Sequence, residues 1–438
     1  MKEIDLTKGK VTSVILALAI PIMGSSLLQF AYNIIDMIWV GGLGSDAVAS
    51  VGSVSFFTGL GYAINALVVV GTGIKVSHSI GEKNELNVKK YINAGIIINI
   101  IIALIFSFIL ILFGKELIDF LNLQNEKVEV DAYKYMAVNG PVIFLGFFNT
   151  LYTRVFNSFG NNKEAFIIST IGVVINIVLD PILIYIFKMG IIGAAIGTLI
   201  SNIVMIILFH KKSNGTIKYD FKNKIEKNKI IEIIKLGFPM ASQRILFTVI
   251  NIFLAKIIAI FGSDAVAAQK IGVQIESVTF MVVGGLNGAV STFVGQNYGG
   301  KNYKRVIEGY KSSIKIGVGY SLITALAFLI VPDFFVKIFL NDVDTIAIAS
   351  AYLRIIALAQ IFSAIEMVSN GFFTGIGKPK IPAFISVFFT ALRLPMALLL
   401  INIIGINGVW LSIALSSFLK GITSYIAYKK SGLKNNYN

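Results

Sequence analysis

A few acidic and amide side chains lie within otherwise apolar stretches, and these residues have the types and spacing to do chemistry. Asp36 lies in an apolar run that also contains Tyr32, one helical turn earlier and therefore on the same helix face. Exposing a carboxylate to lipid costs about 3 kcal/mol or more, so Asp36 must face a cavity or a partner. We interpret Asp36 as a functional acid. The alternatives are an acid paired with a cation such as Arg154, or one that reaches the headgroup region.

A second acid follows further along the chain, in the motif Asn176-Ile-Val-Leu-Asp180-Pro181. Asn176 and Asp180 share a helix face at a spacing of four, and Pro181 frees the carbonyl of Ile177 nearby. Such an oxygen-rich patch suits a hard cation such as Na⁺. A pair of carboxylates could equally bind a proton, because burial without a counter-ion favours the protonated acid. The alternative is a kink that does no more than stabilise a bend.

The second half of the chain has acids of its own. Glu276 and Glu366 each lie in an apolar stretch. They could act as counter-ions for a cationic substrate, or form structural pairs with Arg244 or Arg393, because buried charges in membrane spans usually pair. If both acids are paired internally, substrate selectivity must rest on shape and on aromatic side chains.

Composition identifies the setting of these residues. The chain has 438 residues, of which 56% are hydrophobic and 14% charged, and its mean hydropathy is +0.81. Soluble domains have about 25% charged residues, so this is an integral membrane protein. A net charge of +15 indicates loops beside anionic lipid rather than nucleic acid. We predict the bilayer as a partner and no obligate protein partner. Without cysteine or a histidine–acid cluster, an enzyme is disfavoured.

The apolar runs predict an all-α polytopic membrane protein with twelve transmembrane helices. They are expected at residues 11–38, 50–79, 91–113, 132–157, 165–187, 191–210, 231–260, 269–295, 310–331, 346–374, 382–403 and 407–428. Lysines concentrate in alternate loops, and the even number of spans agrees with this pattern. We therefore predict that both termini are cytoplasmic.

The chain is built twice. The stretch from Pro21 to Ala49 recurs from Pro239 to Ala267, and both copies end in Gly-Ser-Asp-Ala-Val-Ala. We predict an N-lobe at residues 1–212, a basic cytoplasmic linker at 213–229 and a C-lobe at 230–438. With an even number of spans in each, two pseudo-symmetric six-helix lobes would enclose a central cavity.

The two copies differ at the candidate site. Asp36 aligns with Leu254 in the second copy, and Tyr32 aligns with Ile250. An acid that is present in one copy and absent from the other is not required by the architecture. The asymmetry argues for one coupling site rather than two.

These features together resemble the multidrug and toxic compound extrusion (MATE) transporters, most closely the DinF-like branch. The resemblance rests on the twelve spans, the duplicated turn, the Asn176–Pro181 motif and the Gly-Gln-Asn-Tyr-Gly segment at residues 295–299. It implies ion-coupled export of organic, often cationic, compounds by rocking of two lobes. It also implies one cation site, formed by Tyr32, Asp36, Asn176, Asp180 and Thr198.

We therefore predict an antiporter of the cytoplasmic (inner) membrane that exports small organic drugs or toxins. The coupling ion would be Na⁺ or H⁺, with Na⁺ held at Asp36, Asn176 and Asp180, and no other cofactor is expected. The main alternative is a flippase for lipid-linked oligosaccharide or another polar lipid, from a related superfamily. Basic residues at membrane depth keep that alternative open, because they also mark anionic ligands; these residues are Arg154, Arg244, Lys256 and Arg393.

Overall fold

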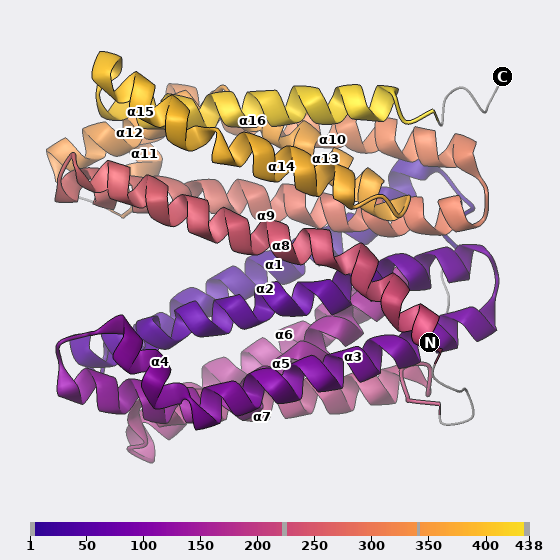
Figure 1. Cartoon of the computed structure of the whole chain (residues 1–438), viewed down its shortest axis with the longest axis horizontal. Helices are drawn as coiled ribbons and strands as arrows, with labels where there is room; N and C mark the ends of the chain where they lie inside the picture. The colour runs from indigo at the N-terminus through magenta and orange to yellow at the C-terminus, as the bar shows by residue number, and fades with distance from the viewer. Residues whose placement is uncertain (1–4, 221–225, 340–341, 433–438) are drawn as a thin grey trace. The chain divides into compact units, whose positions relative to one another are not determined.

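The structure, a computed structural model, describes residues 5–220, 226–339 and 342–432. Within these ranges every regular element is a helix (Figure 1). Part of the predicted linker, residues 221–225, and the ends of the chain lie outside the described residues.

The helices of the first half follow the predicted spans closely. They are α1 (Val11–Gly41), α2 (Ser45–Gly81), α3 (Glu85–Leu112), the short α4 (Gly114–Leu121), α5 (Glu126–Ser158), α6 (Asn162–Pro181) with its π-helical continuation η1 (Ile182–Ile186), and α7 (Gly190–Ser213).

The second half repeats this order with two spans broken into pairs of helices. It contains α8 (Lys227–Ala259), α9 (Ser263–Gly299), α10 (Tyr303–Ile330), the short α11 (Pro332–Lys337), α12 (Val343–Ala357), α13 (Gln360–Gly375), α14 (Lys380–Ala391), α15 (Arg393–Ile404) and α16 (Ile406–Lys429). The short helices α4 and α11 occupy matching places in the two halves, between the third and fourth spans of each.

Twelve spans result when the broken helices are joined. Ten segments of the described chain are long and apolar enough to cross a membrane, counting α14 with α15 as one, and the pair α12–α13, bent by 56°, is an eleventh. The twelfth is α5, whose hydropathy is lowered by Asn139, Pro141 and Asn149. The predicted all-α fold with twelve spans is confirmed.

The duplicated Gly-Ser-Asp-Ala-Val-Ala sequence has a structural cause. Gly44 precedes α2 with φ 104°, and Gly262 precedes α9 with φ 96°. A positive φ of this kind is disfavoured for residues with a Cβ. Glycine therefore lets the backbone turn sharply between the first and second spans of each repeat. The following loops match as well, because Lys83 and Lys301 both have φ 56°.

The chain divides into two compact units, and α1 and α8 each take part in both. The N-terminal unit contains Gly24–Ala241, and the C-terminal unit contains Leu6–Met23 together with the chain from Ser242 onward. Each helix changes unit three residues after its proline, Pro21 or Pro239. The linker and the first half of α8 thus belong to the N-terminal unit, and the first half of α1 belongs to the C-terminal unit.

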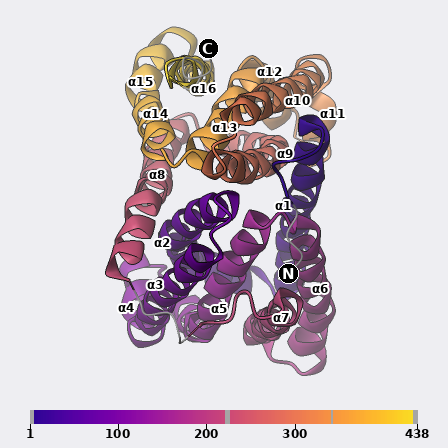
Figure 2. The ribbon, with the colours of Figure 1, turned by 90° about the vertical axis from the view of Figure 1, so that its right-hand side faces the viewer.

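Each unit has its own core. In the N-terminal unit α5 packs against α2, α3 and α7 (Figure 2), around buried aromatic side chains such as Phe147, Phe156 and Phe209. In the C-terminal unit α13 packs against α9, α10 and α16, and its buried aromatics include Tyr310, Phe372 and Trp410. The candidate site is assembled within the first of these units.

Candidate functional site

The residues predicted to form one cation site lie together in the N-terminal unit. Tyr32 and Asp36 come from α1, Asn176 and Asp180 from α6, and Thr198 from α7. The carboxyl groups of Asp36 and Asp180 are close enough to interact directly. Asp180 is fully buried and Asn176 almost so, whereas Asp36 is half-buried beside a cavity. Two ionised carboxylates that interact directly repel each other, and a cation or a proton would relieve this repulsion.

Hydrogen bonds fix the amide and hydroxyl groups of the site. Asn176 Nδ2 donates to Asp180 Oδ1 at 2.9 Å, and it lies 3.4 Å from Thr198 Oγ1. The Thr198 hydroxyl donates to the carbonyl of Ala194 at 3.0 Å, and its oxygen lies 3.4 Å from the Tyr32 hydroxyl. The Asn176 amide N–H group is therefore engaged by Asp180 and the Thr198 proton by Ala194, and Oδ1 of Asn176 remains for a ligand.

Two buried oxygens at this place lack a hydrogen-bond donor among the described residues. They are Oδ1 of Asn176 and Oδ2 of Asp180. Buried polar oxygens without a donor are costly, and a bound cation satisfies them. Carboxylate, amide and hydroxyl oxygens are also the ligand types that hard cations prefer. The residues present therefore fit Na⁺, and Asp36, Asn176 and Asp180 are those that would hold it.

The backbone of α6 changes its geometry at the site. After Asp180 and Pro181 the helix continues as the π-helix η1, because Pro181 has no N–H to donate to the carbonyl of Ile177. Single turns of π-helix are frequent at functional sites. Tyr185 of η1 donates from its hydroxyl to the carbonyl of Trp39 on α1. This bond joins the helix that carries Asp180 to the helix that carries Asp36.

The structure adds two residues that sequence reasoning missed. A Cβ at Gly197 of α7 would clash with Oδ1 of Asp180 and lie 3.2 Å from Nδ2 of Asn176, so glycine makes room for the acid. Its signal in the sequence is the spacing of small residues Gly193, Gly197 and Ser201, which are all buried on α7. The second residue is Tyr135 of α5, which lines the same cavity as Asp36 and has no sequence signal of its own.

A cavity of about 460 Å³ opens beside the site within the N-terminal unit. The site residues Tyr32, Asp36, Asn176 and Thr198 form part of its wall. Aromatic and methionine side chains form another part, namely Met37, Tyr62, Tyr135 and Met205. A ligand in this cavity would touch the same side chains that are predicted to hold the cation.

The corresponding place in the C-terminal unit has no acid in its lining and no room for a ligand. Ile250 and Thr390, which align with Tyr32 and Asn176, line a space that leaves no room for a water-sized molecule. Leu254, which aligns with Asp36, is buried in the apolar core. Of the two aligned places, the one in the first repeat therefore has the pair of acids, and the one in the second repeat does not.

The acids of the C-terminal unit have internal partners. Glu276 accepts hydrogen bonds from the Tyr352 hydroxyl at 2.7 Å and from Gln360 Nε2 at 3.1 Å. Glu366 forms an ion pair with Lys420 at 3.0 Å, a partner that the sequence did not suggest. Arg244 makes neither of these contacts.

Arg393 completes this cluster in the C-terminal unit. It donates to the hydroxyl of Ser416 at 3.1 Å and interacts electrostatically with both Glu276 and Glu366. Two acids and two bases thus balance each other in a buried place. The prediction that the acids bind substrate stays a prediction.

Comparison with known proteins identifies the family. The MatE profile matches residues 21–182 and 239–399, which together make up most of the chain and correspond to its two repeats. The chain belongs to the MatE family. It is accordingly a MATE transporter, a multi-pass membrane protein and not an enzyme. Its assignment to the DinF-like branch stays a prediction.

Relatives named as multidrug resistance or export proteins span nearly the full chain. The probable multidrug resistance protein NorM of Thermotoga maritima is 26% identical over 413 residues, covering 91% of this chain and 88% of that protein. The multidrug export protein MepA of Staphylococcus aureus (strain MSSA476) is 25% identical over 439 residues, covering 96% of this chain and 94% of MepA.

Solved structures show the same fold. A mutant of the Vibrio cholerae MATE transporter VcmN superposes with a TM-score of 0.92 at 21% identity, over 96% of this chain and 97% of that one. A transporter of the MOP superfamily from Pyrococcus furiosus gives a TM-score of 0.90 at 22% identity, over 99% of both chains. At this level of identity the likeness concerns the fold.

Proposed function

We propose that this MATE transporter is a cation-coupled antiporter that exports organic, often cationic, compounds by alternating access. The observation that carries the proposal is the interacting pair Asp36 and Asp180, together with Oδ2 of Asp180 and Oδ1 of Asn176, which lack a hydrogen-bond donor among the described residues. The names of relatives such as NorM and MepA, which describe multidrug resistance and export, support the class of substrate.

Coupling would follow from competition for this site. With both carboxylates ionised, repulsion between Asp36 and Asp180 is relieved by Na⁺ or by a proton. Binding changes the charge beside the cavity and pulls α1, α6 and α7 toward one arrangement. A ligand shifts a conformational equilibrium only by its difference in affinity for the two states. The cation must therefore favour the arrangement that holds the exported compound less tightly.

Substrate recognition would rest on the shape of the cavity and its aromatic wall. Tyr62 and Tyr135 offer π-faces to a cation, and Met37 and Met205 can adapt to different ligands. The internal partners of Glu276 and Glu366 favour this division of roles over one in which those acids attract the substrate. We further propose the cytoplasmic membrane as the location, with both termini on the cytoplasmic side, from the lysine distribution.

Efflux of a fluorescent cationic dye from proteoliposomes tests the proposal, with a Na⁺ gradient and a pH gradient imposed separately. One of the two gradients should drive efflux by the parent protein. Asp36→Asn should insert into the membrane but lose gradient-driven efflux and the drug resistance that the parent gives a sensitive host. Asp46→Asn is the matched control, because Asp46 lies at the exposed start of α2 in an ion pair with Lys127.

The results separate the alternatives. Normal efflux by Asp36→Asn would remove this acid from the mechanism. Movement of a labelled polar lipid in the same vesicles, without dye efflux under either gradient, would favour the flippase.

A further inference from the structure

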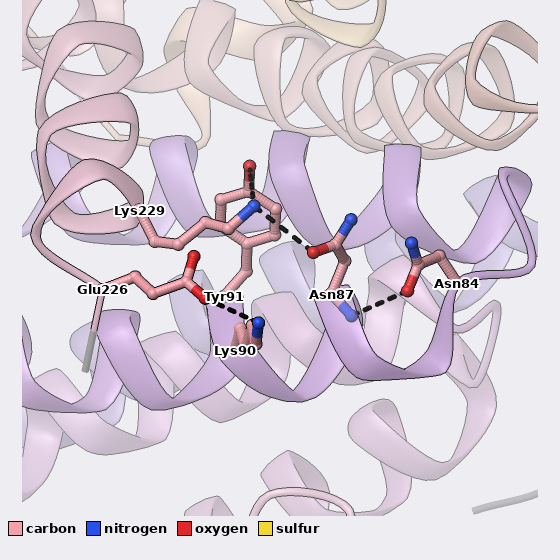
Figure 3. Close-up of polar contacts among 6 residues, drawn as sticks. All are labelled: Asn84, Asn87, Lys90, Tyr91, Glu226 and Lys229. Carbon is pink, nitrogen blue, oxygen red and sulfur yellow. Dashed lines mark hydrogen bonds and ion pairs between the residues drawn. The ribbon is translucent and has the colours of Figure 1, made fainter. Parts of the chain in front are cut away.

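The first half of α8 is tied to the N-terminal unit by a cluster of charged and polar side chains. We call this cluster the latch; its members are Lys75 of α2, Asn87, Lys90 and Tyr91 of α3, Glu226 just before α8, and Lys229 and Glu232 of α8. Figure 3 shows the part of it around Tyr91. None of these residues belongs to the cation site.

Glu232 makes the central contacts of the latch. Its Oε2 accepts a hydrogen bond from the Tyr91 hydroxyl at 2.6 Å and forms an ion pair with Lys75 Nζ. Two helices of the N-terminal unit, α2 and α3, thus hold one carboxylate of α8.

Further contacts lie at Lys229, one turn before Glu232, and at Glu226, about two turns before it (Figure 3). Lys229 Nζ donates to the Tyr91 hydroxyl at 3.2 Å and to Asn87 Oδ1 at 3.3 Å, and it lies 4.3 Å from the centre of the Tyr91 ring. Glu226 pairs with Lys90 at 2.6 Å, and Lys90 together with Lys229 lowers the pKa of Glu226. The latch therefore consists of a connected group of five side chains and, beside it, the ion pair between Lys90 and Glu226.

The latch consists of bonds that water can replace. The Lys75 and Glu232 side chains are 25% and 38% exposed, and those of Lys90 and Glu226 are 23% and 42% exposed. Ion pairs at this exposure are worth little net free energy, so they can open and close reversibly. Beside these ion pairs α8 approaches α2 closely. The approach leaves no space for a side chain at Gly71, where a Cβ would clash with the carbonyl of Ile233. The polar bonds hold this close approach together without making it permanent.

The repeat shows that the latch is present at one of two equivalent places. In the register that aligns Pro21 with Pro239, Val14 takes the place of Glu232, and Phe293 takes the place of Lys75. In the C-terminal unit the start of α1 is held by a buried apolar cluster that includes Ile15, Leu18 and Phe293. There Arg305 also donates to the carbonyls of Leu6, Lys8 and Gly9. At α8 the polar latch accompanies the apolar packing of Ile233 and Ile230, whereas the apolar cluster at the start of α1 has no ion pair in the place of Lys75 and Glu232.

The position of the latch on the chain gives it a consequence for motion. α8 is one helix whose first half lies in the N-terminal unit and whose second half, from Ser242, lies in the C-terminal unit. If the two units change their relative placement, α8 must bend near Pro239 or its first half must leave the N-terminal unit. We infer that the latch is the releasable contact of the transport cycle, and that α8 detaches from α2 and α3 while α1 stays attached to the C-terminal unit. This inference rests on alternating access as proposed above.

Distances between spin labels test the latch directly, because the chain has no cysteine and two introduced cysteines carry all the label. Lys163→Cys and Asn228→Cys, both exposed, report on α8 relative to the N-terminal unit. Lys10→Cys and Lys378→Cys, also exposed, report on the start of α1 within the C-terminal unit.

With labels at residues 163 and 228, the population at longer distances should be roughly threefold larger in Glu232→Gln than in the parent. This increase is expected for the loss of a half-exposed ion pair. Glu232→Lys should enlarge it further, and adding Lys75→Glu should reverse part of the change. Glu85→Gln, which alters an exposed acid on α3 outside the latch, should leave the distances as in the parent. The second labelled pair should keep its parent distances in every variant.

Two outcomes would overturn the inference. The first is a parent-like distribution in Glu232→Gln and Glu232→Lys, since polar release would then play no part. The second is a larger shift at the start of α1 than at α8. Neither readout depends on which ion drives transport, so failure of the latch and failure of the cation site can be told apart.

Discussion

Gly197 of α7 lies against the carboxyl group of Asp180 on α6, at a separation that leaves no space for a methyl group. The absence of a side chain on one helix therefore sets the position of an acid on another. Asn176 fixes the same carboxyl from within α6, through its bond to Oδ1. The position of Asp180 thus depends on both helices.

Replacing Gly197 by alanine should displace Asp180 and weaken cation binding at least tenfold, or about 1.4 kcal/mol. Cation-dependent protection of the purified protein against thermal unfolding measures this, since a bound ligand stabilises the folded state. Gly59→Ala in α2 is the control, because an added Cβ there meets no atom within 4 Å. Equal cation protection in Gly197→Ala and the parent would contradict the role of Gly197.

Thr198 should matter through its oxygen rather than its size. Its hydroxyl proton goes to the carbonyl of Ala194, which leaves the oxygen to face Tyr32 and Asn176. Thr198→Val keeps the shape but removes the oxygen, and should raise the cation concentration needed for half-maximal efflux about tenfold. Thr198→Ser retains the oxygen and should stay near the parent value. Equal loss in both variants would indicate a packing role instead.

The ion pair between Lys420 and Glu366 should behave as a buried pair, because these side chains are 7% and 13% exposed. Lys420→Met leaves a carboxylate without its partner, and should lower the free energy of unfolding by about 3 kcal/mol. Adding Glu366→Leu should recover most of that loss. Thermal unfolding in detergent provides the comparison.

An exposed pair gives the control for that experiment. Arg354 and Asp333 are each 51% exposed and lie 3.7 Å apart, so breaking this pair should cost about 0.5 kcal/mol or less. If Lys420→Met is no worse than Arg354→Met, the buried cluster is not stabilised by charge pairing.

Asp342 should stabilise the start of α12 in a pH-dependent way. Its side chain accepts hydrogen bonds from the hydroxyl and the N–H of Thr345 at 2.6 and 2.8 Å, and these bonds lower the pKa of Asp342. Because the pKa of Asp342 is lowered in the folded state, its ionised carboxylate stabilises the fold at any pH above the ordinary pKa of Asp. This contribution to stability is lost as the pH falls through the lowered pKa.

Hydrogen exchange over residues 343–357 checks this expectation. At neutral pH, Asp342→Ala should exchange faster than the parent in this segment. The difference should vanish at a pH below the lowered pKa, and a difference that persists there would exclude the carboxylate as its cause.

Much of the fold could be predicted because apolar length and repetition are visible in the chain. Asp36 and Asp180 were found because a charge in an apolar helix is rare and costly. The helices α2 and α3 extend beyond their predicted ends, because Ser45 and Glu85 start turns outside the apolar runs. The break between α12 and α13, at residues 358 and 359, carries no proline or glycine to indicate it.

Side-chain partners across helices could not be predicted in the same way. Gly197 acts by leaving space, and the sequence does not say whose side chain fills it. Lys420 lies at the last span, far along the chain from Glu366, so many other cations were equally plausible partners. The contacts of Glu232 depend on how α8 crosses α2 and α3, which hydropathy does not determine. Such contacts depend on three-dimensional packing that one sequence leaves open.

The exchange of segments between units has a consequence for biogenesis. The opening turns of α1 leave the ribosome before the residues that bury them, such as Leu286 and Phe293 of α9, have been made. During synthesis the start of α1 therefore stays incompletely packed until α9, in the second half of the chain, has been translated. When the two halves are expressed as separate polypeptides, co-expression should therefore yield more folded N-terminal half than expression of that half alone.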